Sequence, residues 1–183
     1  MFVGTPIQVR LPNLERPGAP RLQLNAPPEA VLLSADKPVT SSDDLPIIGD
    51  LDMITDGDCD GSDGSYVELG PGLQWVQIDL EKSHEFFGIV LWHFHKNARA
   101  YLDVIVQISD DPTFKTGVTT VYNNDHDNSA GLGRGKDKAW VETNHGRIID
   151  VPGTKARYLR LYSRGNTANE MNHYVEVEVF GKP

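Results

Sequence analysis

The sequence has little of several features that would point directly to a function. Cys59 is the only cysteine among 183 residues, so no internal disulfide can form and cysteine usage leaves the compartment open. No apolar run approaches the roughly 18 residues that a membrane span needs. Residues 1–6 lack the basic start and apolar stretch of a signal peptide. The sequence therefore predicts neither a disulfide framework nor insertion into a membrane.

Basic residues are also scarce. The chain holds 17 lysines and arginines against 26 aspartates and glutamates, a net charge of −9. Because phosphate contacts need a basic patch, we expect no nucleic-acid partner. The hydrophobic and charged fractions, 39 % and 23 %, are ordinary for a soluble globular protein, and the length fits one domain with additional terminal sequence.

Catalytic motifs are missing. His84–Gly88 begins like a zinc-protease motif, but Gly88 stands where the second histidine belongs. The glycine-rich run Gly131–Lys136 fits neither the Walker nor the dinucleotide spacing, and no nucleophile elbow occurs. Cys59 sits among carboxylates, which raise the pKa of a thiol. We therefore predict a protein that is not an enzyme.

What the sequence does have is a series of short segments with a period of two, which indicates half-buried strands. Residues 87–94 are more continuously apolar, as expected for a central strand. Glycine and proline turn signals, among them Pro152-Gly153, separate the segments. This pattern predicts an all-β sandwich or barrel. The other expected strands are 76–80, 102–108, 147–151, 156–163 and 175–179.

Residues 1–30 differ from the rest because they hold six of the twelve prolines. Proline fixes φ and removes a donor, so this stretch is predicted to be an extended arm. It is either a linker or an arm packed on the domain, and residues 1–10 could add a strand. Packing is suggested by four leucines: Leu11, Leu14, Leu22 and Leu24.

The clearest chemical signal is an aspartate loop, residues 50–63, in which six of fourteen residues are aspartates. Calcium suits such a loop because it takes six to eight oxygen ligands. The spacing Asp56-x-Asp58-x-Asp60 matches the first half of an EF-hand loop, but the twelfth position is Val67 and Gly70-Pro71-Gly72 cannot continue a helix. The alternatives are a calcium loop of another kind and a solvated acidic turn.

Five segments in order resemble a coagulation-factor C-type (discoidin) domain over about residues 31–183. The resemblance implies an eight-stranded antiparallel jelly-roll sandwich of the galactose-binding-like class, similar to family-32 carbohydrate-binding modules. The segments are Lys37–Ser42 with Thr55–Asp58, Trp75–Leu80, Ile89–Leu91 followed by Asp103–Asp111, Ala156–Leu161, and Glu176–Gly181.

The resemblance also implies a structural calcium ion held by Asp56, Asp58 and Glu176. Residues are inserted after Asp58 relative to the family pattern, so the remaining ligands are open, with Asp60 and Asp63 as the candidates. Family members are commonly attached to secreted or surface enzymes. We therefore expect a piece of a larger multidomain protein that is extracellular, periplasmic or on the cell surface.

In the family, loops at one end of the sandwich bind the ligand, and three loop regions here are rich in groups that bind sugar hydroxyls. The alternative for each is core packing or an ordered turn. The candidates are His93, His95, Arg99 and Tyr101 in the first region, Asn124, Asp125 and His126 in the second, and Arg164, Asn169, Asn172 and His173 in the third.

The predicted function is a non-catalytic carbohydrate-binding module with a structural calcium, which holds an attached enzyme or a cell surface near a glycan. The first alternative is a protein- or surface-adhesion domain on the same fold. The second is a metal-dependent hydrolase. It would need the histidines to converge on a transition metal, and His93 and His95 would point to the same side of a strand.

Overall fold

The computed structural model describes residues 9–16, 20 and 22–183. Within them the chain forms nine β-strands and one short 3₁₀ helix, η1 (Leu51–Thr55). The strands are β1 (Val31–Leu32), β2 (Val39–Ser41), β3 (Val67–Leu69), β4 (Gln74–Trp92), β5 (Ile105–Ser109), β6 (Thr119–Asn123), β7 (Arg147–Ser163), β8 (Asn172–Tyr174) and β9 (Glu176–Lys182). All strand pairs are antiparallel, so the predicted all-β class is confirmed.

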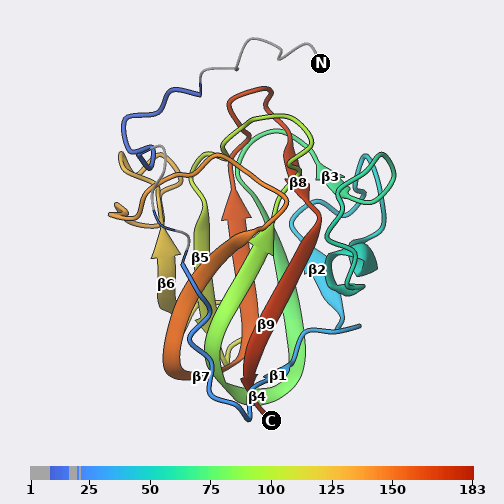
Figure 1. Cartoon of the computed structure of the whole chain (residues 1–183), viewed down its shortest axis with the longest axis vertical. Helices are drawn as coiled ribbons and strands as arrows, with labels where there is room; N and C mark the ends of the chain where they lie inside the picture. Colours follow the sequence, from blue (N-terminus) through green and yellow to red (C-terminus); the bar gives the residue numbers. More distant parts are fainter. Residues whose placement is uncertain (1–8, 17–19, 21) are drawn as a thin grey trace.

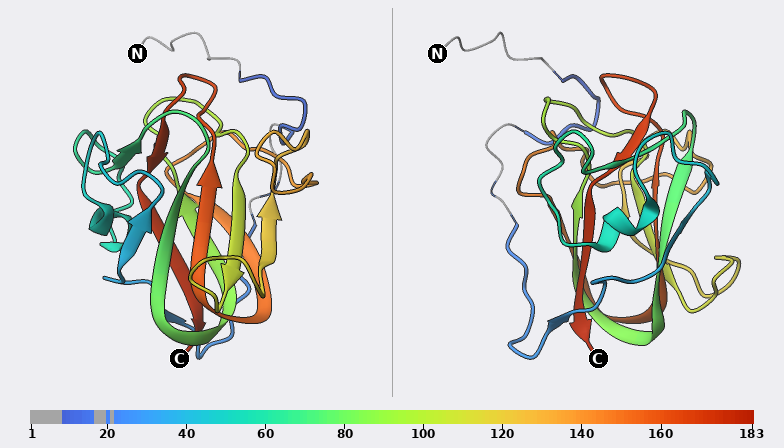
Figure 2. Two further views of the ribbon diagram at one scale, coloured as in Figure 1. Left: turned by 180° about the vertical axis from the view of Figure 1, so that it is seen from behind. Right: turned by 90° about the vertical axis from the view of Figure 1, so that its right-hand side faces the viewer.

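Two long bent strands build both layers of a sandwich. The first part of β4 pairs with the last part of β7, in one layer with β2, β5 and β6. The second part of β4 pairs with the first part of β7, in the other layer with β9 and β1. The bends lie at the end of the molecule near the C-terminus (Figure 2). β3 and β8 form a separate pair near the opposite end (Figure 1).

The bends correct the strand boundaries predicted from the sequence. Segment 76–80 and residues 87–92 of segment 87–94 belong to one strand, β4, whose pairing with β7 shifts register between Asp79 and His84. Pro152-Gly153 is not a turn between two strands but an irregularity inside β7, where Gly153 has a φ of +66°. A bulge of this kind bends a strand without ending it.

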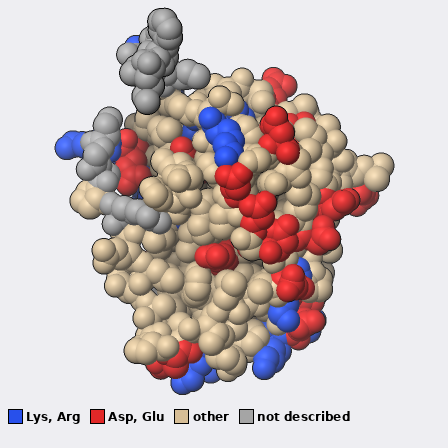
Figure 3. Space-filling view, turned by 45° about the vertical axis from the view of Figure 1, so that its right-hand side comes forward, with Lys and Arg blue, Asp and Glu red and all other residues tan. Residues whose placement is uncertain are grey.

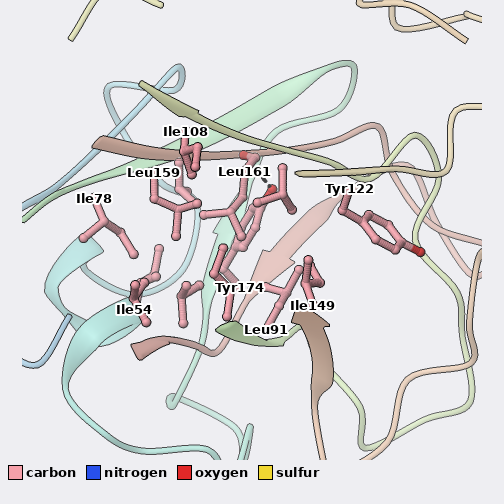
Figure 4. Close-up of a cluster of buried hydrophobic side chains, with 14 of the residues drawn as sticks. Ile54, Ile78, Leu91, Ile108, Tyr122, Ile149, Leu159, Leu161 and Tyr174 are labelled. Atoms are coloured by element: carbon pink, nitrogen blue, oxygen red, sulfur yellow. Dashed lines mark hydrogen bonds between the residues drawn. The ribbon is translucent and has the colours of Figure 1, made fainter. Parts of the chain in front are cut away.

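The core lies between the two layers and is built from the inward side chains that the alternating pattern predicts (Figure 4). Ile78 and Leu91 come from the two parts of β4, and Leu159 and Ile149 from the two parts of β7. Tyr174 is fully buried among them. This core fixes the ends of the strands and therefore the loops that leave them.

The described part of the N-terminal arm packs on the domain. Leu24 lies so close to β4 that a Cβ atom at Gly88 would be 2.2 Å from its Cδ1 atom. Further along the domain, Leu14 forms an isolated parallel β-bridge with Ala139. The Glu15 carboxylate accepts a 2.6 Å hydrogen bond from Arg147. The arm thus runs beside the long loop 124–146 (Figures 1 and 2). Residues 1–8 lie outside the described part, and the division at residue 30 stays a prediction.

The loops at the end away from the bends hold most of the predicted ligand residues. They connect β4 to β5, β6 to β7 and β7 to β8, and they gather above the open ends of the strands (Figure 1). In the part of the chain that the structure describes, no helix has the length and apolar character to cross a membrane. The candidate site is therefore sought at this loop end.

Candidate functional site

Three of the predicted ligand residues, His93, Tyr101 and His173, meet in a buried polar network. His93 is fully buried, its Nδ1 atom is 2.7 Å from a Glu142 carboxylate oxygen, and its ring stacks on Tyr101. The Tyr101 hydroxyl contacts His173 Nδ1 at 2.8 Å, and His173 Nε2 lies 2.8 Å from the Glu68 carboxylate. The network therefore links the β4–β5 loop to β8 and β3.

Burial shapes the electrostatics of this network. It raises the pKa of Tyr101 well above its usual value and lowers the pKa of His173, against the opposing effect of Glu68. Arg99 is 7 % exposed, and its guanidinium lies 4.5 Å from the Phe94 ring centroid. Because these side chains hold each other below the surface, they support the shape of the loop end and offer little direct contact to a ligand.

A second group of predicted residues lines a pocket of about 290 Å³ between the arm and the loops. We call it the arm pocket. Leu11, Leu102 and Ala139 contribute apolar surface, and Arg164 and Asn124 contribute hydrogen-bonding groups. Asn13 ties the arm to this wall, since its amide donates a 2.6 Å hydrogen bond to the Asn124 carbonyl. The remaining lining residues are Tyr101, Asp103, His126, Asp127 and Ser129.

Three carboxylates converge beside the arm pocket. One oxygen each from Asp103, Asp125 and Asp127 lies within 4.8 Å of the others, a grouping that could hold a metal ion. The loop itself supplies donors. Asp125 accepts hydrogen bonds from the Ser129 and Ala130 amides at 3.0 and 2.9 Å, and Asp103 accepts one from the Ser129 hydroxyl at 2.8 Å. We call these residues the aspartate triad.

The triad carboxylates have different proton affinities. Burial raises the pKa of Asp103, with Asp125 and Asp127 adding to the effect. Hydrogen bonds from Ser129 lower the pKa of Asp127, which stands at the exposed rim. Arg164 is 3.8 Å from Asp103 and is the cation that faces the triad in the pocket lining. At neutral pH the pocket therefore has an excess of negative charge.

The aspartate loop is organised differently. The Asp56 and Asp58 carboxylates accept hydrogen bonds from the amides two residues ahead, and Asp60 is bound by Lys96 at 2.7 Å. Glu176, at the start of β9, is 1 % exposed and accepts a 3.0 Å hydrogen bond from the Gly57 amide. Burial raises the pKa of Glu176 to about 8, and Asp56, Glu178 and Asp58 contribute.

Glu176 therefore lies near enough to Asp56 and Asp58 for their charges to act on it, but the oxygens of these three carboxylates do not meet the spacing of a metal group, and Asp60 is paired with Lys96. Asp63 is exposed. Acidic side chains mark this side of the surface as a band (Figure 3). Cys59 lies within the same loop, and burial followed by the neighbouring carboxylates raises the pKa of its thiol to about 12. The thiol stays protonated at neutral pH, so a nucleophilic role is disfavoured.

The other predicted residues have structural contacts. The Asn172 amide donates to the Gly70 carbonyl, and its Oδ1 atom accepts from Ser163. The Asn169 Oδ1 atom accepts from Asn166. His93 and His95 both lie beyond the end of β4, so they do not share a strand face as expected. Among the described residues only the aspartate triad meets the spacing for a metal group, and no histidine belongs to it.

Several residues that line the arm pocket are not predicted as ligand residues from the sequence. Asp103 falls near the start of the expected strand 102–108, yet it has a φ of +52° that turns the chain ahead of β5. No local pattern indicates that it meets residues more than twenty positions away. Leu11 and Asn13 belong to the arm, outside the family resemblance. The spacing Asp125-x-Asp127 was the one available signal for the triad.

The sequence matches no protein-family profile and no curated protein. Solved structures do match. The CBM32 module of AlyQ, in complex with 4,5-unsaturated mannuronic acid, is 21 % identical with a TM-score of 0.57, covering 80 % of this chain and 96 % of that one. A chitosan-binding module of a Paenibacillus chitosanase/glucanase is 21 % identical with a TM-score of 0.59, covering 82 % and 99 %.

A family 89 glycoside hydrolase from Clostridium perfringens is 19 % identical with a TM-score of 0.61 over 83 % of this chain, which corresponds to only 15 % of the enzyme. At these identities the likeness establishes the fold. The chain has the sandwich architecture of CBM32-like carbohydrate-binding modules, as the family resemblance predicts, and two of the matched structures are modules without their parent enzymes.

Proposed function

We propose that this chain is a non-catalytic carbohydrate-binding module whose glycan site is the arm pocket. The observation that carries the proposal is a pocket of about 290 Å³ with an apolar wall and a polar rim at the loop end of this fold. Sugars need both surfaces, because their hydroxyls require donors and acceptors while their C–H faces require apolar contact. The matched modules that bind sugars support this assignment.

A glycan-array screen of the folded full chain, performed in calcium and again in chelator, tests the proposal. We expect selective binding to a few related sugars, with low affinity for a single site because a small polar ligand buries little apolar surface. Arg164→Ala should weaken the signal, whereas Arg16→Ala, an exposed arginine of the arm that does not line the pocket, should not. An array without signal from a folded protein would contradict a glycan function.

We further propose that Glu176, Asp56 and Asp58 hold a structural calcium ion. The donor chemistry fits, because all three are hard oxygen ligands and calcium prefers carboxylates. Their oxygens would have to approach one another to share one ion, since among the described residues only the aspartate triad has that spacing. A buried carboxylate whose pKa is raised among other carboxylates is also what a bound cation would stabilise. The ion would fix the aspartate loop against β9 and take no part in a reaction.

The proposal that this chain belongs to a larger protein rests on analogy with a matched structure. The Clostridium perfringens match covers a small part of a long enzyme, so a module of this fold occurs there within a larger protein. We propose that this chain likewise serves a larger exported protein by holding it near a glycan.

A second candidate, protein adhesion on the same fold, is favoured by one observation. Leu45 and Ile47 are 83 % and 54 % exposed on the loop before η1, where they offer apolar surface to a partner. Binding to a cell surface that soluble sugars do not compete for, and that Leu45→Ser abolishes, would support adhesion.

A further inference from the structure

The aspartate triad leaves unused acceptor atoms at the arm pocket. Both oxygens of Asp125 accept backbone hydrogen bonds, from Ser129 and Ala130. Asp103 and Asp127 each use one oxygen on Ser129, and the other oxygen of each has no hydrogen bond to a described residue. Both residues line the pocket. The free acceptors therefore belong to the two carboxylates that a ligand can reach.

The balance of charge favours a cationic group at this point. Three carboxylates face one guanidinium, that of Arg164, which is 3.8 Å from Asp103 and also donates to the Ser129 carbonyl. His126 also lines the pocket and contributes to lowering the pKa of Asp127. Charge-assisted N–H···O hydrogen bonds are about 2.8 Å long, so acceptors arranged tetrahedrally around one ammonium nitrogen lie about 4.6 Å apart. One oxygen from each triad carboxylate lies within 4.8 Å of the others, a limit that admits that spacing.

An independent observation points to a ligand oxygen beside this cation. Asn124 lines the pocket, is 2 % exposed, and its Nδ2 atom has no hydrogen-bond acceptor among the described residues. A buried amide left without a partner is unfavourable, so it marks a place where a ligand acceptor fits. The apolar side chains of Leu11, Leu102 and Ala139 complete the surroundings of a compact ring.

We propose that the arm pocket binds the protonated amine of an amino sugar, with Asp103 and Asp127 accepting its hydrogen bonds and Asn124 donating to a neighbouring hydroxyl. This inference rests on the proposed glycan-binding function and names the sugar class. The N-terminal arm is part of the site, because Leu11 lines the pocket and Asn13 holds Asn124 through its backbone carbonyl.

An ammonium group suits the triad better than a divalent metal ion. Calcium takes six to eight oxygens. Here four of the six carboxylate oxygens already accept hydrogen bonds from Ser129 or Ala130. These donors would oppose a divalent ion, whereas an ammonium group needs only two or three acceptors.

Calorimetric titration of the full chain with three tetrasaccharides tests the proposal. The sugars are the glucosamine tetramer, its fully N-acetylated form and cellotetraose, all at mildly acidic pH where the free amine is protonated. We expect the glucosamine tetramer to bind about tenfold more tightly than the other two, the fold-change of one hydrogen bond to a charged group. Asp127→Asn should remove that preference, and Glu170→Gln, an exposed carboxylate outside the pocket, should keep it.

The outcomes separate the two proposals. Equal binding of all three sugars, unchanged in Asp127→Asn, would overturn the amine selectivity and leave the module function standing. Absence of binding to any glycan would remove both. A calcium-binding heat that disappears in Asp127→Asn, together with displacement of the sugar by calcium, would overturn the ammonium site in favour of a metal site.

Discussion

The aspartate loop and the aspartate triad are two acidic regions with the same residue type and different means of stabilisation. In the loop, Asp56 and Asp58 bond to their own backbone two residues ahead, which points successive carboxylates outward and leaves Glu176 buried among negative neighbours. In the triad, Asp125 is satisfied by two amides of the same loop. In the first arrangement the cation Lys96 pairs with Asp60 and not with Glu176, whereas in the second the most buried carboxylate, Asp125, has a backbone donor for each oxygen.

The largest expected effect concerns the calcium ion proposed for the aspartate loop. Calcium at a hundredfold excess over its dissociation constant should raise the free energy of unfolding by about 2.7 kcal/mol, because it binds only the folded state. Glu176→Gln should abolish this gain, and Asp125→Asn should keep it. Urea unfolding in calcium and in chelator measures both.

If Glu176→Gln retains the full calcium effect, the ion binds elsewhere and the two regions do not differ as described. Loss of the effect in Asp125→Asn alone would place the ion at the triad.

The next effect compares the same substitution in the two regions, with chelator present. Asp125→Ala should lower the free energy of unfolding by about 2 kcal/mol, because the Ala130 amide loses its acceptor in a partly buried site. Asp58→Ala removes one exposed hydrogen bond to Asp60 and should change stability little. Chemical denaturation of the two variants side by side checks this, and equal losses would contradict the comparison.

Sequence reasoning found the fold and the density of acidic residues, but not the convergence of those residues. The period-two pattern of strands such as β9 depends on local alternation, so it could be read directly, whereas the bends in β4 and β7 come from register shifts that have no local signature. Glu176 could be placed beside Asp56 and Asp58 because the family resemblance supplied a long-range contact.

For the aspartate triad the family resemblance supplies no long-range contact. The triad joins the turn before β5 to the loop after β6, and its pocket is completed by an arm outside the recognised domain. The sequence predicts ligand contacts for His93 and His173 because their residue types suit sugars. Their burial depends on aromatic packing with Tyr101, which a sequence pattern does not reveal.

The smallest expected effect on stability comes from Asp103→Asn. This variant tests whether a triad residue serves ligand binding or stability. Asp103 has a raised pKa because it is buried, so the folded state holds this proton to a higher pH than the unfolded chain does. The resulting penalty appears as the pH rises above the unfolded value of about 3.9 and is complete above the folded pKa. At neutral pH the substitution removes this penalty.

Asparagine also fits the site, because it adopts the left-handed conformation that the φ of +52° requires and can still accept from the Ser129 hydroxyl. The loss of the Arg164 contact offsets part of the gain. We therefore expect the melting temperature to stay the same or rise by up to about 2 °C, which corresponds to about 0.5 kcal/mol for a domain of this size. Binding of the glucosamine tetramer should weaken in the same variant. A clear fall in melting temperature would instead make Asp103 a structural residue, with the triad stabilising the fold and contributing no ligand contact.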